Sequence, residues 1–126
     1  MPRKRSLALT DVEAEVMKAL WRLQSASVAS VVDGLNETRP ASYSTVQTIL
    51  RILETKGYVT HDKVARAFIY RPVVDKRQAR RRALRHLISR LFDGSPSLLV
   101  LNILEDVDID PEERERLRKA IERVGG

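Results

Sequence analysis

The stretch SYSTVQTILRILETKGYVT, from Ser42 to Thr60, has the hydrophobic pattern of a helix followed by that of a strand. Apolar residues recur with the helical period in its first part, at Val46, Ile49, Leu50 and Leu53. Ser42 can cap this helix, and Gly57 suits the left-handed residue that often follows a helix end. The stretch therefore predicts a helix over residues 43–56.

The residues after this helix predict a β-hairpin. The runs YVTH (58–61) and AFIYR (67–71) are rich in β-branched and aromatic residues, and the charged segment DKVAR separates them. Pro72 ends the second run. We expect Lys63 and Arg66 to bracket the tip of this hairpin.

Two helical patterns precede the stretch. Thr10 and Glu13 form a capping box before apolar residues at Val12, Val16, Ala19, Leu20 and Leu23. Ser27 can cap a second helix, with apolar residues at Val28, Val31, Val32 and Leu35. Trp21, on the flank of the first helix, is expected in the core. Three helices and a hairpin predict a winged helix-turn-helix domain over residues 7–73.

The pattern from residue 74 to residue 126 is purely helical. Asp75, Ser95 and Asp110 suit the N-caps of three helices, and Gly94 suits the end of the first. The predicted fold class is therefore mainly α with a small β-hairpin wing. It consists of the N-terminal winged helix-turn-helix domain and a C-terminal region of three helices.

The middle helix of that region contains SLLVLNILED, from Ser97 to Asp106. On a helix, its large apolar side chains point in almost every direction, and a helix that is apolar all round must be buried all round. One amide, Asn102, lies among them. The residues alone leave open what buries this helix.

The charge of the chain is unevenly distributed. Residues 51–90 contain twelve Lys and Arg against three acidic residues, whereas residues 91–126 contain five basic and nine acidic residues. A basic middle beside an acidic end indicates one surface for a polyanion and another for a different partner. A solvated charged face is the alternative interpretation.

The polar face of the helix over 43–56 is the candidate DNA-reading surface. Ser44, Gln47, Thr48 and Arg51 lie opposite the apolar face. Gln can pair with adenine and Arg with guanine, and the second helix of such a motif normally enters the major groove. The predicted DNA-binding residues are Tyr43, Ser44, Thr45, Gln47, Thr48, Arg51, Lys63 and Arg66, supported by a basic arm at Arg3, Lys4 and Arg5. An ordinary polar helix face is the alternative.

Several function classes are disfavoured. The chain has no Cys, so it has neither a disulfide framework nor a thiolate metal site. MPRKRSLALT lacks the apolar segment of a signal peptide, and the apolar run at 98–104 is far shorter than the roughly 20 residues of a membrane helix. No catalytic motif occurs, and His61 and His86 do not suggest a metal pair. We expect a soluble, cytoplasmic, non-enzymatic protein without a cofactor.

Four segments, LTDVEAEVMKALW, YSTVQTILRILETKGYV, ARAFIYRPVV and SLLVLNILED, resemble the penicillinase-repressor family of bacterial transcriptional regulators. The resemblance extends from about Leu9 to Val124. It implies a homodimer whose winged helix binds operator DNA with TACA and TGTA half-sites and whose C-terminal helices interlock, so that the second chain buries the helix around Asn102. The residues expected at this interface are Leu84, Leu87, Ile88, Leu91, Leu98, Leu101, Leu104, Leu117 and Ile121.

The resemblance also gives Asn102 a role. In β-lactam-responsive members, a membrane zinc-metalloprotease receptor senses the antibiotic and leads to cleavage after an Asn in this helix. The matching bond is Asn102–Ile103, although well-known members have Phe where this chain has Ile103. The alternative is an Asn that fixes the register of an apolar interface. Copper-responsive members carry a Cys-rich motif that this chain lacks, and Ile52 replaces a residue that is basic in many relatives.

Two other functions stay open at this point. One is a winged-helix regulator that an inducer releases by binding between its helices. The other is a winged helix that serves as a protein-interaction module without an operator.

Overall fold

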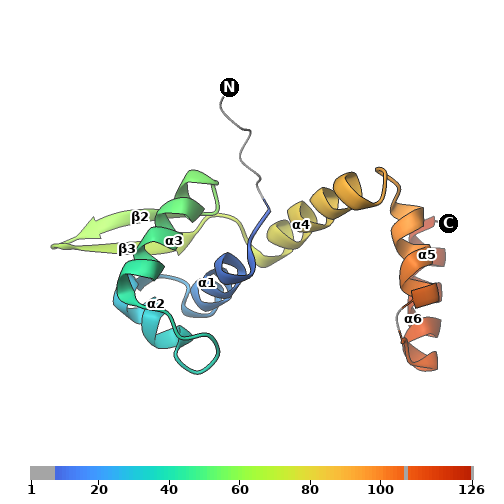
Figure 1. Ribbon diagram of the computed structural model, residues 1–126, viewed down its shortest axis with the longest axis horizontal. Coiled ribbons are helices and arrows are strands. Elements are labelled where there is room, and N and C mark those ends of the chain that lie inside the picture. Colours follow the sequence, from blue (N-terminus) through green and yellow to red (C-terminus); the bar gives the residue numbers. More distant parts are fainter. Residues whose placement is uncertain (1–7, 107, 126) are drawn as a thin grey trace. The chain divides into compact units, whose positions relative to one another are not determined.

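The computed structural model describes residues 8–106 and 108–125 (Figure 1). The elements are α1 (Asp11–Leu23), β1 (Ala26–Ser27), α2 (Val28–Leu35), α3 (Tyr43–Thr55), β2 (Val59–Val64), β3 (Ala67–Pro72), α4 (Lys76–Leu91), α5 (Pro96–Asp106) and α6 (Pro111–Gly125). The chain divides into two compact units, Met1–Leu84 and Arg85–Gly126. The predicted basic arm at Arg3, Lys4 and Arg5 lies outside the described residues.

Local hydrogen bonds set the starts of the first three helices, as the sequence predicts. Thr10 and Glu13 form the reciprocal capping box of α1, in which the Thr10 side chain accepts a hydrogen bond from the Glu13 N–H. The hydroxyl oxygens of Ser27 and Ser42 accept from the backbone N–H groups of Ser30 and Thr45 at the starts of α2 and α3. These bonds satisfy donors that a helix start otherwise leaves unpaired.

The sheet of the first unit has three strands in the order β1-β3-β2, and both pairings are antiparallel. The sequence predicts the hairpin of β2 and β3 but not β1, which has only two residues and directly precedes α2. β1 pairs Ala26 with Tyr70 and Ser27 with Ile69. It therefore ties the start of α2 to the wing.

The tip of the wing is shorter than the sequence predicts. β2 continues to Val64, which pairs with Ala67, so that only Ala65 and Arg66 form the turn. Ala65 has a φ of 57°, a left-handed conformation typical of tight hairpin turns. Lys63 lies within the strand, opposite Phe68, and not at the tip. Arg66 alone of the expected pair occupies the turn.

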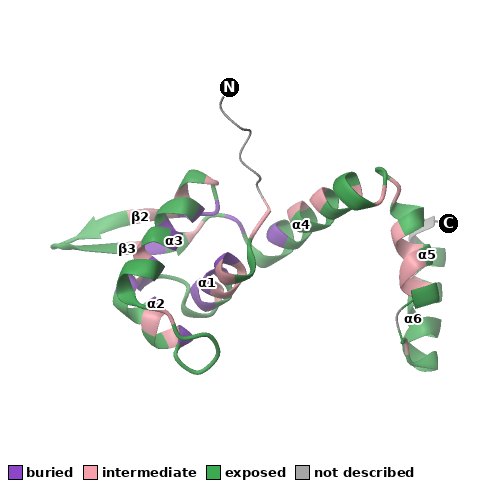
Figure 2. Ribbon diagram, viewed as in Figure 1, coloured by how far each residue is buried: buried purple, intermediate pink, exposed green. Residues whose placement is uncertain are grey.

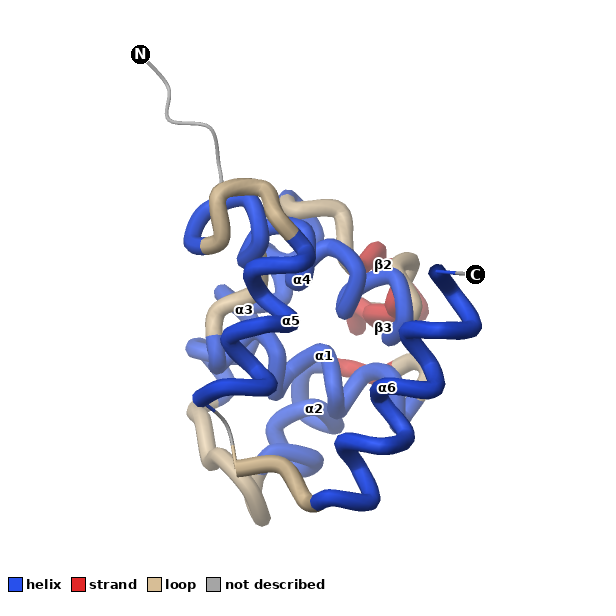
Figure 3. The backbone as a smooth tube through the Cα atoms, turned by 90° about the vertical axis from the view of Figure 1, so that its right-hand side faces the viewer, coloured by secondary structure: helices blue, strands red, loops and turns tan. Residues whose placement is uncertain are grey.

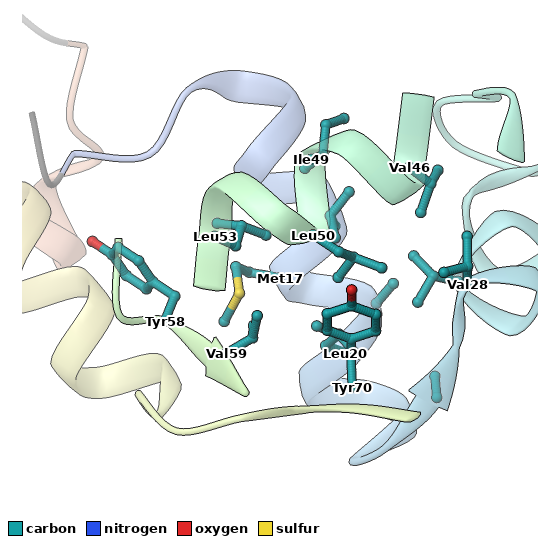
Figure 4. Close-up of a cluster of buried hydrophobic side chains, with 14 of the residues drawn as sticks. Met17, Leu20, Val28, Val46, Ile49, Leu50, Leu53, Tyr58, Val59 and Tyr70 are labelled. Atoms are coloured by element: carbon teal, nitrogen blue, oxygen red, sulfur yellow. The ribbon is translucent and has the colours of Figure 1, made fainter. Parts of the chain in front are cut away.

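The core of the first unit lies between the three helices and the sheet (Figure 4). Met17 and Leu20 of α1 meet Leu50 and Leu53 of α3, and all four side chains are fully buried. Trp21 packs against this core as expected, and its Nε1 donates a hydrogen bond to the Val74 carbonyl oxygen at 3.0 Å.

The first half of α4 belongs to the first unit. Asp75 and Gln78 form a reciprocal cap at its start. Ala79 is buried, and the Arg82 guanidinium lies 5.0 Å from the ring centre of Tyr58. The sequence suggests a boundary between residues 73 and 74, but these contacts extend the first unit to Leu84.

The second unit has well-formed helices but no buried residue among 85–106 and 108–123 (Figure 2). Ser95 and Asp110 cap α5 and α6, as the sequence predicts. α5 and α6 run in opposite directions (Figure 3). α5 is not buried within the chain, although its apolar composition predicts burial on all sides.

The stability of the first unit should depend on the ion pair between Glu13 and Lys56. The Lys56 Nζ lies 2.7 Å from Glu13 Oε1, and the two side chains are only 11% and 6% exposed. Lys56→Met leaves the Glu13 carboxylate buried without its cation, so we expect a loss of about 3–5 kcal/mol in the free energy of unfolding. Urea unfolding followed by the fluorescence of Trp21, the single tryptophan, measures this loss.

Lys18 provides the matched control. It pairs with Glu15 at 3.3 Å, but its side chain is 58% exposed. Lys18→Met should cost about 1 kcal/mol or less, because exposed ion pairs contribute little. Equal losses for the two variants would contradict the importance of the buried pair.

Candidate nucleic-acid interface

The helix α3 separates its side chains into a buried face and a polar exposed face. Val46, Ile49, Leu50 and Leu53 are buried, which fixes the rotation of the helix. Tyr43 is 54% exposed. The other predicted contact residues on this helix are exposed or, for Gln47, half-buried: Ser44, Thr45, Gln47, Thr48 and Arg51.

Hydrogen bonds within α3 already hold two of these hydroxyl groups. Ser42 Oγ donates to Thr45 Oγ1 at 2.8 Å, and Thr48 Oγ1 donates to the Ser44 carbonyl oxygen at 3.0 Å. The hydroxyl hydrogen of Thr48 is therefore engaged, and its oxygen can accept a hydrogen bond from an amino group on a base edge. Thr45 Oγ1 accepts the hydrogen bond from Ser42, which leaves the hydroxyl hydrogen of Thr45 outside that bond.

A groove of about 440 Å³ lies between the starts of α2 and α3 and the strand β3. It brings together three of the predicted contact residues, Tyr43, Gln47 and Arg66. Its full lining is Ser27, Val28, Ala29, Tyr43, Gln47, Arg66, Ala67, Phe68 and Tyr70. Arg66 brings a cation to the end of α3 that carries Tyr43 and Gln47. Lys63 does not line this groove.

The sequence gives no site role to Ser27, Ala29 or Phe68, although all three line the groove. Ser27 is predictable only as a helix cap. Ser27 also pairs with Ile69 of the wing, and this pairing exists because Ser27 belongs to the short strand β1. The small residues Ser27 and Ala29 at the start of α2 are the signal in the sequence that could have indicated that this end of α2 lines the groove.

A second cavity of about 310 Å³ lies further along α3, lined by Arg51, Glu54, Thr55, His61, Phe68 and Tyr70. His61 Nδ1 lies 2.5 Å from Glu54 Oε1, and its ring stacks on Phe68 with the centres 4.3 Å apart. His61 therefore connects the wing to α3. Burial, reinforced by the Glu54 carboxylate, raises the pKa of the Tyr70 phenol.

The residues expected at a dimer interface form an exposed apolar set. Leu91 is 69% exposed, Leu101 is 51% exposed and Ile121 is 50% exposed. Leu84, Leu87, Leu98 and Leu117 are also exposed, while Ile88 and Leu104 are half-buried. Within α5, Asn102 Nδ2 donates to the Leu98 carbonyl oxygen at 2.8 Å, so the amide is bonded inside its own helix.

Among residues 8–106 and 108–125, no cluster of three or more His, Cys, Asp and Glu side chains could hold a metal ion. Within the same ranges, no single helix is long and apolar enough to cross a membrane, and α4 and α5 pass that test only as a pair joined across a sharp bend.

Three helices, a short sheet and an exposed hydrogen-bonding face on the third helix define a winged helix-turn-helix protein of the DNA-binding class. The family model described as Penicillinase repressor matches residues 9–123, and the chain belongs to that family. The family consists of transcriptional repressors and not of enzymes.

Individual relatives agree with this assignment. The penicillinase repressor of Bacillus licheniformis is 32% identical over 119 residues, which cover 94% of this chain and 93% of the relative. The methicillin resistance regulatory protein MecI of Mammaliicoccus sciuri is 25% identical, with 94% and 97% covered. The solution structure of the DNA binding domain of the repressor BlaI is 36% identical, with a TM-score of 0.52, and covers 60% of this chain and 93% of that domain.

Proposed function

We propose that this protein is a homodimeric, cytoplasmic repressor that binds a dyad operator overlapping a promoter. The observation that carries this proposal is the groove that brings Gln47 and Tyr43 of α3 beside Arg66 of the wing. With the start of α3 in the major groove, Gln47 and Thr48 discriminate among bases. Arg51, Lys63 and Arg66 attract the phosphates of the DNA backbone. In the dimer, the α3 helices of both chains occupy the operator, and the bound protein excludes RNA polymerase from the promoter.

The exposed apolar residues of the second unit support the homodimer. None of its described residues is fully buried within the chain, yet Leu98, Leu101 and Leu104 lie on one short helix. Contact with the same helices of another chain removes these side chains from water. Joining two DNA-binding units also raises the effective concentration of the second unit at its half-site.

Cleavage after Asn102 is the proposed release step, in response to a β-lactam or cell-wall-stress signal passed on by a membrane zinc-metalloprotease sensor. The bond Asn102–Ile103 lies within α5, so a cut there divides the apolar helix of the interface. A protease needs an extended backbone, and the helix must therefore open locally before it is cut. Loss of the dimer then removes the gain from joined half-sites.

Loss of a base contact and loss of a phosphate contact should have different effects on DNA binding. Gln47→Ala should weaken binding to a dyad with TACA and TGTA half-sites by roughly 1–3 kcal/mol and relax the preference at one base pair per half-site. Lys63→Ala should weaken all sequences alike and reduce the slope of log affinity against log salt by about 0.9 for each lost phosphate contact. Competition gel shifts at several salt concentrations measure both effects, and unchanged selectivity in Gln47→Ala would contradict the placement of α3.

The dimer should depend on the apolar face of α5. Leu101→Asp places an unpaired carboxylate in the interface, which costs several kcal/mol, so we expect a monomer at micromolar concentration. Val64→Asp is the matched control, because Val64 is 59% exposed on the wing. Sedimentation equilibrium distinguishes the states. A well-folded wild-type monomer would exclude this part of the proposal.

Regulated cleavage should produce a defined fragment. Coexpression with a candidate zinc-protease sensor and its inducer should yield residues 1–102 by mass spectrometry, and cleavage should be slower on operator DNA than off it, because both bound half-sites hold the dimer together. Asn102→Ala should block release, whereas Asn36→Ala, in the turn after α2, should not. Full-length protein that leaves the promoter without any fragment would favour release by an inducer.

A further inference from the structure

Glu54 extends the stripe of polar residues along α3. At roughly 100° per residue, Gln47, Arg51 and Glu54 lie within about 60° of one another on this helix. Glu54 is therefore a carboxylate on the side of α3 that carries the proposed base and phosphate contacts. An acidic residue in this position opposes DNA binding, because it repels phosphates and can form an ion pair with Arg51 three residues earlier.

The structure pairs Glu54 with His61 of the wing instead. His61 Nδ1 lies 2.5 Å from Glu54 Oε1 and 3.0 Å from Glu54 Oε2. An ionised carboxylate can only accept hydrogen bonds, so His61 Nδ1 carries the hydrogen and donates it. The two side chains are 30% and 34% exposed, whereas those of the wing pair Arg71 and Asp62 are 52% and 66% exposed. The wing therefore holds both oxygens of the Glu54 carboxylate in a half-buried contact.

The aromatic residues of β3 fix the His61 ring for this contact. The ring stacks on Phe68 with the ring centres 4.3 Å apart, and the centre of the Tyr70 ring lies 5.3 Å away. His61 pairs directly with Tyr70 across the two strands. Since Phe68 lies two residues before Tyr70 on the same strand, all three rings share the face of the wing that meets α3. The packing of the hairpin thus orients the His61 donor toward Glu54.

Arg51 lies beside this contact without taking part in it. Arg51, Glu54 and His61 line the same cavity, and the Arg51 side chain is exposed. Burial and the Glu54 carboxylate raise the pKa of the Tyr70 phenol while Arg51 lowers it, so both charges lie close to that ring. Among residues 8–106 and 108–125, Arg51 forms no ion pair. Its guanidinium is therefore available to an anion from outside the chain.

We propose that His61 keeps the Glu54 carboxylate away from Arg51 and so leaves the Arg51 guanidinium free for a DNA phosphate. The inference rests on the phosphate contact of Arg51 in the proposed function and adds a positioning residue in the wing. His61 acts through Glu54 and not by a contact of its own with DNA. Without the His61 donor, the carboxylate pairs with Arg51, and DNA must break that ion pair in order to bind.

The alternative is a contact that only fastens the wing to α3. The wing has other attachments, because β1 pairs with β3 and because Val59 of β2 and Tyr70 of β3 are buried in the core. The position of the hairpin therefore does not depend on His61 alone. This redundancy favours a role for His61 in the distribution of charge on α3.

His61→Phe in the full chain tests the inference. The variant keeps an aromatic ring beside Phe68 and removes the donor to Glu54. We expect binding to a duplex with the TACA and TGTA dyad to weaken by roughly two- to fivefold, which is the combined strength of two helical ion pairs, one in each chain. A random duplex should show the same fold-change, because a phosphate contact carries no base preference.

A second substitution at Glu54 separates the two interpretations. His61→Phe/Glu54→Gln should bind DNA at least as tightly as the wild type, because no carboxylate remains to pair with Arg51. If His61 only fastens the wing, the double variant should stay as weak as His61→Phe. The matched control is His61→Phe/Glu15→Gln, which removes a carboxylate from the ion pair with Lys18 on α1 and should not restore binding.

Fluorescence anisotropy of labelled duplexes measures these affinities, and the fluorescence of Trp21 verifies that each variant is folded. A folded His61→Phe variant with wild-type affinity would overturn the inference. So would a double variant with Glu54→Gln that binds no more tightly than His61→Phe alone.

Arg51→Ala tells the failure of this inference from the failure of the proposed function. In an Arg51→Ala chain, His61→Phe should weaken DNA binding no further, because the two residues act on one contact. If Arg51→Ala alone binds as tightly as the wild type, the phosphate contact in the proposed function is wrong and the inference is overturned with it. If Arg51→Ala binds more weakly but Glu54→Gln restores nothing, the inference alone is wrong.

Discussion

The apolar surface of α5 is the constraint on which the second unit and the proposed regulation depend. Five large apolar side chains in succession, Leu98 to Ile103 with only Asn102 among them, occupy almost the whole circumference of one short helix. None of them is fully buried within the chain, since Leu98 and Leu101 are exposed and Leu99, Val100 and Ile103 are half-buried. Burial of one Leu side chain contributes about 1.5–3 kcal/mol, so a surface of this size is costly to leave in water. Association with a second chain is the proposed solution.

The first unit does not share this constraint, because it has a complete core of its own. The capping box of α1 and the buried Lys56 meet at Glu13, and Trp21 and Arg82 attach the segment from Val74 through the first half of α4 to this core. The reading surface therefore needs no partner to form. A cut at Asn102 would leave this unit folded and remove only its tie to a second copy. Such a division suits a repressor that is inactivated by losing its dimer and not by unfolding its DNA-binding unit.

The sequence predicts those features that depend on local interactions. The caps at Thr10, Ser42, Ser95 and Asp110 and the polar face of α3 follow from side chains within a few residues of one another. The predicted end of β2 lies three residues too early, at His61 instead of Val64, because the turn at Ala65 adopts a left-handed conformation without a glycine to indicate it. The groove is lined by Ser27, Gln47 and Phe68, which come from three different elements. A pattern within one segment of the sequence cannot show that these elements lie side by side. The partner of α5 cannot be found in one chain, because it is proposed to lie in another.

Hydrogen exchange at two protein concentrations tests most directly whether the second unit depends on association. The full chain is labelled at a concentration where sedimentation shows monomer and at one where it shows dimer, and amide protection is read by mass spectrometry. We expect that protection over α5 and α6 rises strongly with concentration, while protection over α1 and α3 stays the same. Equal and strong protection of α5 and α6 in the monomer would contradict it, because those helices would then be stable without a partner.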